Sequence, residues 1–119
     1  MDIRRYFKNV FARLHRRSPQ FHVAFSEDIP EQLEDGLIYL VGSVETRWAA
    51  VFMCPCKCSA RVQLNLLADV RPHWTASVHS DNSVSIRPSI RRGAGCRSHF
   101  WIDGGYVFEA FDSHEDRLR

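Results

Sequence analysis

Four cysteines constrain what this chain can fold into more than any other feature. Three of them alternate within five residues, at Cys54, Cys56 and Cys58, and the fourth, Cys96, follows much later. On an extended segment alternate side chains point to the same face, so the three clustered thiols can all contact one partner. A disulfide between cysteines two residues apart strains the backbone and needs an oxidising compartment. The pattern therefore favours a bound metal ion.

Zinc is the metal that this donor set favours. Structural zinc sites are tetrahedral and typically use four cysteines, or three cysteines and one histidine. We expect Cys54, Cys56, Cys58 and Cys96 to bind one Zn²⁺ with a structural role, because four thiolates leave no open position for chemistry. His99 follows Cys96 at Cys-x-x-His spacing and is an alternative ligand. The sequence alone does not decide between these two sets.

A chain of 119 residues is long enough for one domain, and a metal site would add much to the stability of so small a domain. After residue 20, short runs rich in β-branched and aromatic residues alternate with turn signals. We expect a mainly β (α+β) fold: a small antiparallel β-sandwich or barrel-like domain with a zinc knuckle and three core tryptophans, Trp48, Trp74 and Trp101. The expected strands cover residues 21–25, 37–41, 48–53, 61–66, 74–79, 83–87, 100–102 and 106–111, with hairpin turns at 80–83 and 103–105.

The two ends of the chain differ from this β-rich part. Apolar residues recur at three- and four-residue spacing from Ile3 to Leu14, so residues 3–16 predict an amphipathic helix. The expected organisation is therefore a basic amphipathic N-terminal helix (1–20), a zinc-binding β-rich domain (21–111) and a polar C-terminal tail (112–119).

The net charge of +2 hides an uneven distribution. Residues 1–20 carry six basic residues and one acidic residue, a net of +5, whereas residues 21–50 carry one basic and six acidic residues, a net of −5. This balance makes nucleic acid an unlikely partner. A nucleic-acid-binding zinc module stays a third hypothesis, because a basic face that carries aromatic residues such as Phe100 or Trp101 could be formed by Arg87, Arg91, Arg92, Arg97 and the N-terminal arginines. No run approaches the roughly 20 apolar residues of a membrane span, and no signal peptide is evident, so a cytoplasmic location is expected.

Four blocks of sequence carry a resemblance to a known family. They are Gly36–Leu40, the cysteine cluster followed by Arg61-Val62, Val84–Ile90, and Cys96–Ile102. Together they resemble a small bacterial zinc-binding family that recurs beside ubiquitin-like modifiers and their activating and conjugating enzymes, in systems of phage defence. The similarity covers roughly residues 21–110. It implies hydrolysis of a peptide bond in processing or removing a ubiquitin-like modifier, with the modifier and its conjugating enzymes as partners.

The chain departs from the pattern of that family at several positions. Lys57 and Ser59 occupy positions where relatives usually have glycine, and Phe52 occupies one that is often histidine. Arg91-Arg92 stands where relatives usually have Gly-Asn. If the histidine or the asparagine works chemically in relatives, this chain would be a non-catalytic zinc module that binds the modifier or its conjugating enzymes. That binding module is the alternative hypothesis.

If the chain is a hydrolase, its residues suggest a serine nucleophile and a histidine base. The base must lie within about 2.6–3.2 Å of the serine hydroxyl. Ser98 and His99 are adjacent, so their side chains diverge, whereas Ser89 follows Pro88 at the end of an expected strand and can meet His99 across the sheet. Ser89 and His99 are therefore the predicted catalytic residues. The alternative is that Ser89 caps a turn and His99 is a zinc ligand or a core histidine.

Other residues complete this hypothesis. Asp81 and Asp103 are candidates to orient the imidazole, and the backbone N–H groups of Gly93 and Gly95 are candidates to bind an oxyanion. The expected substrate-binding residues are Arg91, Arg92, Arg97 and Trp101, because arginines can hold an acidic surface or the tail of a protein substrate.

Overall fold

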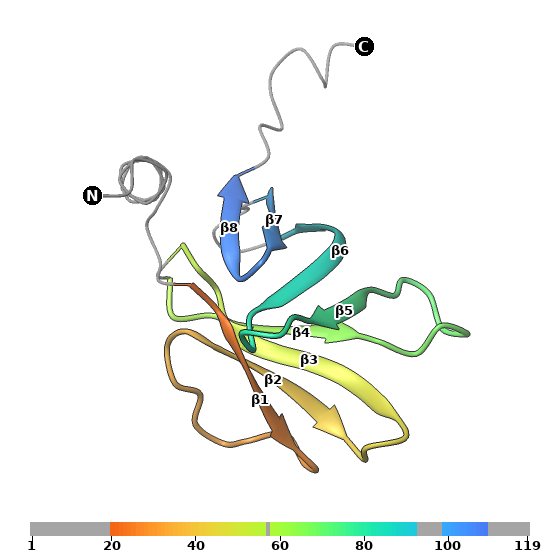
Figure 1. Ribbon diagram of the computed structural model, residues 1–119. Coiled ribbons are helices and arrows are strands. Elements are labelled where there is room, and N and C mark those ends of the chain that lie inside the picture. Colours follow the sequence, from red (N-terminus) through yellow and green to blue (C-terminus); the bar gives the residue numbers. More distant parts are fainter. Residues whose placement is uncertain (1–19, 57, 93–98, 110–119) are drawn as a thin grey trace.

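The structure, a computed structural model, describes residues 20–56, 58–92 and 99–109, which form two four-stranded sheets (Figure 1). We call them the N-terminal and the C-terminal sheet. The strands of the N-terminal sheet lie in the order β1 (His22–Ser26), β2 (Leu37–Gly42), β3 (Arg47–Met53) and β4 (Arg61–Asn65). Those of the C-terminal sheet lie in the order β5 (Thr75–Val78), β6 (Val84–Arg91), β7 (His99–Asp103) and β8 (Tyr106–Glu109). The prediction of a mainly β fold is confirmed.

All eight expected strands are present, most with bounds within one residue of the prediction. The exceptions are β6, which continues past Pro88 to Arg91, and β8, which is described to Glu109, whereas the last two residues of the expected strand lie outside the described residues. The prediction of a wholly antiparallel fold is wrong, because β1 and β2 pair in parallel. The described residues also form no closed barrel. The expected helix at 3–16 and the tail at 112–119 lie outside the described residues.

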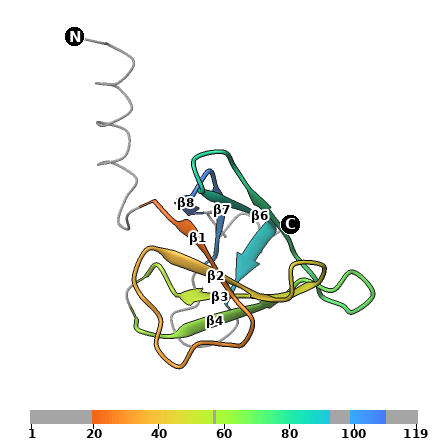
Figure 2. The same cartoon turned by 60° about the horizontal axis from the view of Figure 1, so that its bottom comes forward.

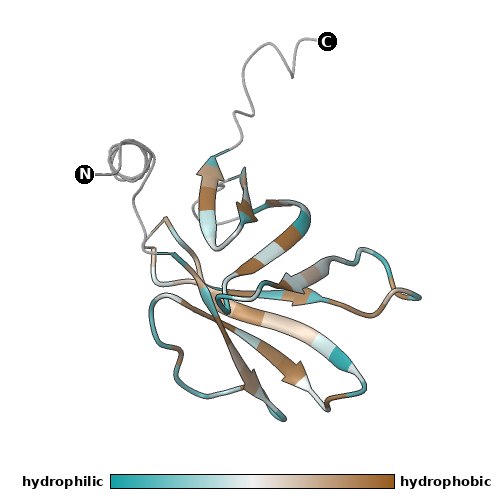
Figure 3. Cartoon of the chain, viewed as in Figure 1, coloured by the Kyte–Doolittle hydropathy of each residue, from teal (hydrophilic) through white to brown (hydrophobic). Residues whose placement is uncertain are grey.

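The inner faces of the two sheets share one hydrophobic core. Its large, fully buried side chains come from both sheets and include Ile38, Phe52, Ile86, Phe100 and Ile102. Alternation along each strand explains this arrangement, since residues two apart point to the same face. Figure 3 shows apolar and polar residues alternating along β6. No helix among the described residues is long and apolar enough to cross a membrane.

The three tryptophans do not all anchor this core. Trp74 packs against it while half-buried. Trp48 is 37% exposed. Trp101 lies on the outer face of the C-terminal sheet and stacks on Phe108, with ring centroids 5.6 Å apart. The prediction of three core tryptophans is therefore wrong for Trp48 and Trp101.

One corner of the molecule joins the two sheets. Figures 1 and 2 show β1 starting beside the C-terminal sheet and running into the N-terminal one. The amide of Phe21 donates to the carbonyl of Gly105 at 2.7 Å, and that of Val23 donates to the carbonyl of Asn82 at 2.8 Å. Gly104 and Gly105 form the predicted turn between β7 and β8, with φ of 58° and 85°. A side chain at Gly105 would clash with the backbone carbonyl of Phe21, so the joint requires glycine there.

Candidate active site and metal centre

A bulge in β6 creates the candidate active site. Ile86 pairs with Ile102 and Ile90 pairs with Phe100, so three residues of β6, at 87–89, lie opposite one residue of β7. A bulge tolerates Pro88, which has no N–H to donate to the ladder. Ile90 points into the core, so its neighbour Ser89 points outward and is exposed.

The bulge brings Ser89 to His99. The cross-strand neighbour of His99 is Arg91, so Ser89 is its diagonal neighbour on the outer face. The Oγ of Ser89 lies 3.0 Å from the Nε2 of His99. This distance lies within the range of about 2.6–3.2 Å over which a histidine can take the proton of a serine hydroxyl. The serine and histidine predicted from the sequence are thus neighbours in the structure.

The second nitrogen of His99 needs a partner of its own. When Nε2 accepts the serine proton, Nδ1 carries the ring hydrogen. The Nδ1 of His99 is buried, and no group among the described residues accepts a hydrogen bond from it. The predicted acidic partners bond elsewhere: Asp81 accepts from Ser83, and Asp103 accepts from Ser85 and Arg87. The prediction that Asp81 or Asp103 orients the imidazole is therefore wrong.

A second serine–histidine pair lies on the same sheet. The Nε2 of His79 lies 2.6 Å from the Oγ of Ser85, which sequence reasoning missed. The hydroxyl of Ser85 also lies 3.2 Å from Asp103 Oδ1 and accepts the N–H of Gly104 at 2.7 Å. Ser85 is only 6% exposed, whereas Ser89 is exposed. We assign this pair to holding β5, β6 and the β7–β8 turn together. The hairpin turn predicted at residues 80–83 joins the two strands, and it could have indicated from the sequence that His79 and Ser85 are neighbours.

The predicted substrate-binding residues are placed differently relative to Ser89 and His99. Arg91 is exposed and directly opposite His99, and Trp101 lies opposite the bulge. Arg92 follows β6 and is half-buried. Arg97, like the oxyanion candidates Gly93 and Gly95, lies outside the described residues. The outer face of the C-terminal sheet therefore carries Ser89, His99, Arg91 and Trp101 together.

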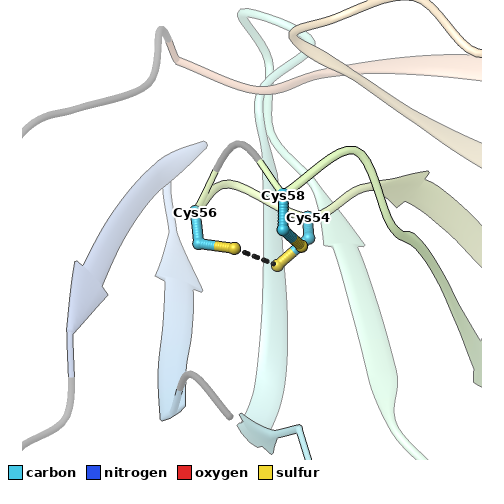
Figure 4. Close-up of side chains that lie close together, drawn as sticks. All are labelled: Cys54, Cys56 and Cys58. Atoms are coloured by element: carbon cyan, nitrogen blue, oxygen red, sulfur yellow. Dashed lines mark hydrogen bonds between the residues drawn. The ribbon is translucent and has the colours of Figure 1, made fainter. Parts of the chain in front are cut away.

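The candidate metal centre follows β3. Cys54 is buried at the end of that strand, and its amide donates to the carbonyl of Ala60 at 2.8 Å, which closes the loop that carries Cys56 and Cys58. Figure 4 shows the three thiols converging. Their sulfur atoms all lie within 4.8 Å of one another, and those of Cys54 and Cys56 are 3.3 Å apart. Sulfurs around a tetrahedral zinc lie about 3.8 Å apart, given a Zn–S distance of about 2.3 Å. Three thiols at this spacing fit a zinc ion.

Two residues are candidates for the fourth ligand. Cys96 lies outside them. His99, the alternative ligand, is not part of the described cysteine group, and its Nε2 faces Ser89. Arg61, close to the cysteines in sequence, donates to the backbone carbonyls of Pro30 and Glu31 at 3.1 and 2.8 Å.

The structure explains two of the positions at which the chain departs from the family pattern, Phe52 and Ser59. Phe52, at the position where relatives often have histidine, is fully buried and packs edge-on against Phe21 with ring centroids 5.5 Å apart. Ser59, at a glycine position, has φ of 66°. The first is a core residue with no chemical role, and the second keeps the backbone conformation that favours glycine.

Comparison with protein families identifies what the chain is related to. The family model described as bacterial ubiquitination-like system serine protease (BubE) matches residues 25–110. The chain belongs to this family. The match spans both sheets, the cysteine cluster and the Ser89–His99 pair, and it confirms the resemblance found in the four sequence blocks. Comparisons with curated proteins and with solved structures give no significant match.

Proposed function

We propose that this BubE-family chain is a serine peptidase that processes or removes a bacterial ubiquitin-like modifier by cleaving at the C-terminal tail of the modifier. The observation that carries the proposal is the exposed Ser89 hydroxyl, 3.0 Å from His99 Nε2, in a member of a serine protease family. The family description supports the class of reaction, and the distance between the two side chains supports Ser89 as the proposed nucleophile and His99 as its proposed base. The proposed site of action is the cytoplasm, where the thiols of the chain stay reduced.

The proposed reaction uses both residues twice. His99 Nε2 takes the proton from Ser89 Oγ while that oxygen attacks the carbonyl carbon of the scissile peptide bond. The protonated imidazole then gives the proton to the leaving amine nitrogen, and an ester to Ser89 remains. His99 next takes a proton from a water molecule while the water oxygen attacks the carbonyl carbon of this ester. The protonated imidazole then gives the proton to Ser89 Oγ as the bond between Oγ and the acyl carbon breaks and the carboxylate product leaves. The backbone N–H groups of Gly93 and Gly95 are the proposed donors to the oxyanion.

The proposed substrate site extends along the outer face of the C-terminal sheet. Trp101 lies opposite the bulge and offers a rigid aromatic surface to the tail of the modifier. The guanidinium groups of Arg91, Arg92 and Arg97 would attract an acidic segment of the same substrate.

The proposed zinc ion is structural. Cys54, Cys56, Cys58 and Cys96 would hold it, and a closed four-thiolate site supplies stability rather than catalysis. Such a site would link the end of β3 to the segment preceding β7, on which His99 lies.

The test is cleavage of a tail-extended modifier by the unaltered protein and by four single variants. Ser89→Ala and His99→Ala should each lower kcat/KM by more than about a thousandfold, because each removes a member of the reacting pair. Ser77→Ala, an exposed serine on the same face, is the matched control and should leave kcat/KM unchanged. Ser85→Ala tests the other pair. Cleavage that survives Ser89→Ala but is lost in Ser85→Ala would contradict the assignment.

The runner-up function is a non-catalytic zinc module that binds the modifier or its conjugating enzymes. It is favoured by one observation, that no described residue accepts a hydrogen bond from the buried Nδ1 of His99. A serine–histidine pair without an orienting group is a weaker catalyst than a triad. Binding of the modifier without any cleavage by the unaltered protein would support this function over the peptidase.

A further inference from the structure

We propose that Trp74 is a positioning residue that holds Ser89 at the candidate active site through its indole N–H. This inference rests on the proposed function, in which Ser89 is the nucleophile. The sequence patterns predict Trp74 only as a core residue, and the family match assigns it no role at the candidate active site.

The bulge leaves Ser89 unpaired with β7, and β5 ends before it reaches Ser89. The last pair between β5 and β6 joins Thr75 to Arg87, so Ser89 lies two residues beyond the end of that ladder. The carbonyl of Ser89 instead accepts a hydrogen bond from the indole Nε1 of Trp74, at 3.2 Å. Trp74 immediately precedes β5, so its side chain replaces the backbone donor that a longer β5 would supply.

Trp74 is itself held in two ways. Its backbone N–H donates to the carbonyl of Asn65 at 2.9 Å, which ties it to the end of β4 in the other sheet. Its half-buried ring packs against the core. The indole N–H that donates to Ser89 is therefore held in a fixed position, and accurate placement of site residues requires such support.

The loop that leads to Trp74 is wound around one side chain. The amide nitrogen of Asn65 lies within hydrogen-bonding distance of the carbonyls of Leu67, Val70 and Pro72, at 3.1, 3.0 and 3.1 Å. The amide oxygen of Asn65 accepts the backbone N–H of Leu67 at 3.1 Å. Asn65 thus fixes the path of residues 66–73, and this path places Trp74 beside the bulge.

This arrangement predicts an effect on turnover and not on substrate binding. Without the indole donor, the peptide between Ser89 and Ile90 gains freedom, and the hydroxyl of Ser89 spends less time 3.0 Å from His99. Trp74 donates to the carbonyl of the nucleophile and is not proposed to touch the substrate. Its loss should therefore lower kcat and leave KM unchanged.

The experiment compares Trp74→Phe with Trp48→Phe in the full chain. Trp48 is the matched control, because it lies in the N-terminal sheet and undergoes the same chemical change. Trp74→Phe should lower kcat by about three- to tenfold, the range for one lost hydrogen bond, with KM within about twofold. Replacing Trp74 by 3-benzothienylalanine, which has sulfur in place of the indole N–H and nearly the same volume, should give the same fall. Amide hydrogen exchange at Ile90 should become faster in both Trp74 variants and not in Trp48→Phe.

The outcomes separate the two claims. Equal kcat and equal exchange at Ile90 in the Trp74 variants and in Trp48→Phe would overturn the positioning role. A raised KM with unchanged kcat would also overturn it, because Trp74 would then contact the substrate. Absence of cleavage by the unaltered protein would overturn the proposed function, while the exchange at Ile90 still decides whether Trp74 holds Ser89.

Discussion

Ser59 has a left-handed backbone conformation, with φ of 66°, in the loop of the cysteine cluster. A side chain in this conformation costs roughly 1–2 kcal/mol, whereas glycine adopts it without strain. Glycine also loses more freedom on folding, which offsets part of that gain. We predict that Ser59→Gly raises the free energy of unfolding by about 0.5–1 kcal/mol, as measured by urea denaturation.

The matched control for this prediction is Ser77→Gly. Ser77 lies within β5, where a glycine weakens a strand, so the same substitution should lower the free energy of unfolding by about 0.5–1 kcal/mol. Equal changes in both variants would show that the conformation of Ser59 stores no strain.

At the scale of residues, the sequence predicted partners where strand spacing determines them. Ser89 and His99 could be paired because both fall on expected neighbouring strands, and the three clustered cysteines converge because they alternate along the chain. The bond from Trp74 to Ser89 could not be predicted, since it depends on where β5 ends and on the size of the bulge in β6. Side-chain partners outside a regular register have no sequence signal.

The turn between β5 and β6 is an element whose stability should depend on pH. The Oδ1 of Asp81 accepts the hydroxyl of Ser83 at 2.6 Å and the backbone N–H of Ser83 at 3.0 Å. These hydrogen bonds, the hydroxyl one first, lower the pKa of Asp81 below its ordinary value of 3.8. A carboxyl whose pKa is lower in the folded state stabilises the fold above its unfolded pKa, and this stabilisation is lost as the pH falls through the folded pKa.

We therefore predict that Asp81→Asn destabilises the protein near neutral pH and has a diminishing effect below about pH 4. The amide keeps an acceptor oxygen but lacks the charge that strengthens the two bonds. Free energies of unfolding measured from pH 7 to pH 2 check this, with the exposed Asp69→Asn as control. A difference between Asp81→Asn and the unaltered protein that stays constant over this range would contradict the prediction.

At the scale of elements, eight short strands could be predicted because turn residues and alternating patterns mark them. The extension of β6 beyond Pro88 could not, since proline usually ends a strand and only the bulge accommodates it. The parallel pairing of β1 and β2 was missed because antiparallel pairing is the usual choice for strands joined by a short loop. The connection at 27–36 is long enough to carry the chain back to the same end of the sheet.

At the scale of the whole molecule, the zinc ion is expected to tie together two distant parts of the chain. We predict one zinc per chain in purified protein. At free zinc a thousandfold above the Kd, binding should add about 4 kcal/mol to the free energy of unfolding. Metal analysis, together with thermal unfolding before and after chelation, measures both quantities.

Cys56→Ser and Cys96→Ser should each lose zinc and unfold at the temperature of the chelated protein. Zinc retained at full stoichiometry in Cys96→Ser would show that another residue supplies the fourth ligand. An unchanged unfolding temperature after chelation would contradict a structural role for the metal.

The arrangement of the two sheets was only partly predictable. Alternating apolar residues indicate that each sheet has one buried face, which makes a layered core a sound expectation. They do not indicate whether the sheets close into a barrel, because closure depends on strand tilt and register. The joint from Phe21 to Gly105 and from Val23 to Asn82 connects backbone groups, which the identities of the side chains do not reveal.

The most direct test of the account is to react the protein with a fluorophosphonate, a reagent that modifies activated serines, and to locate the adduct by peptide mass spectrometry. The account predicts one adduct, on Ser89, that is absent after His99→Ala and present after Ser77→Ala. An adduct on Ser85 or on any other serine, or an adduct on Ser89 that forms equally fast without His99, would contradict it.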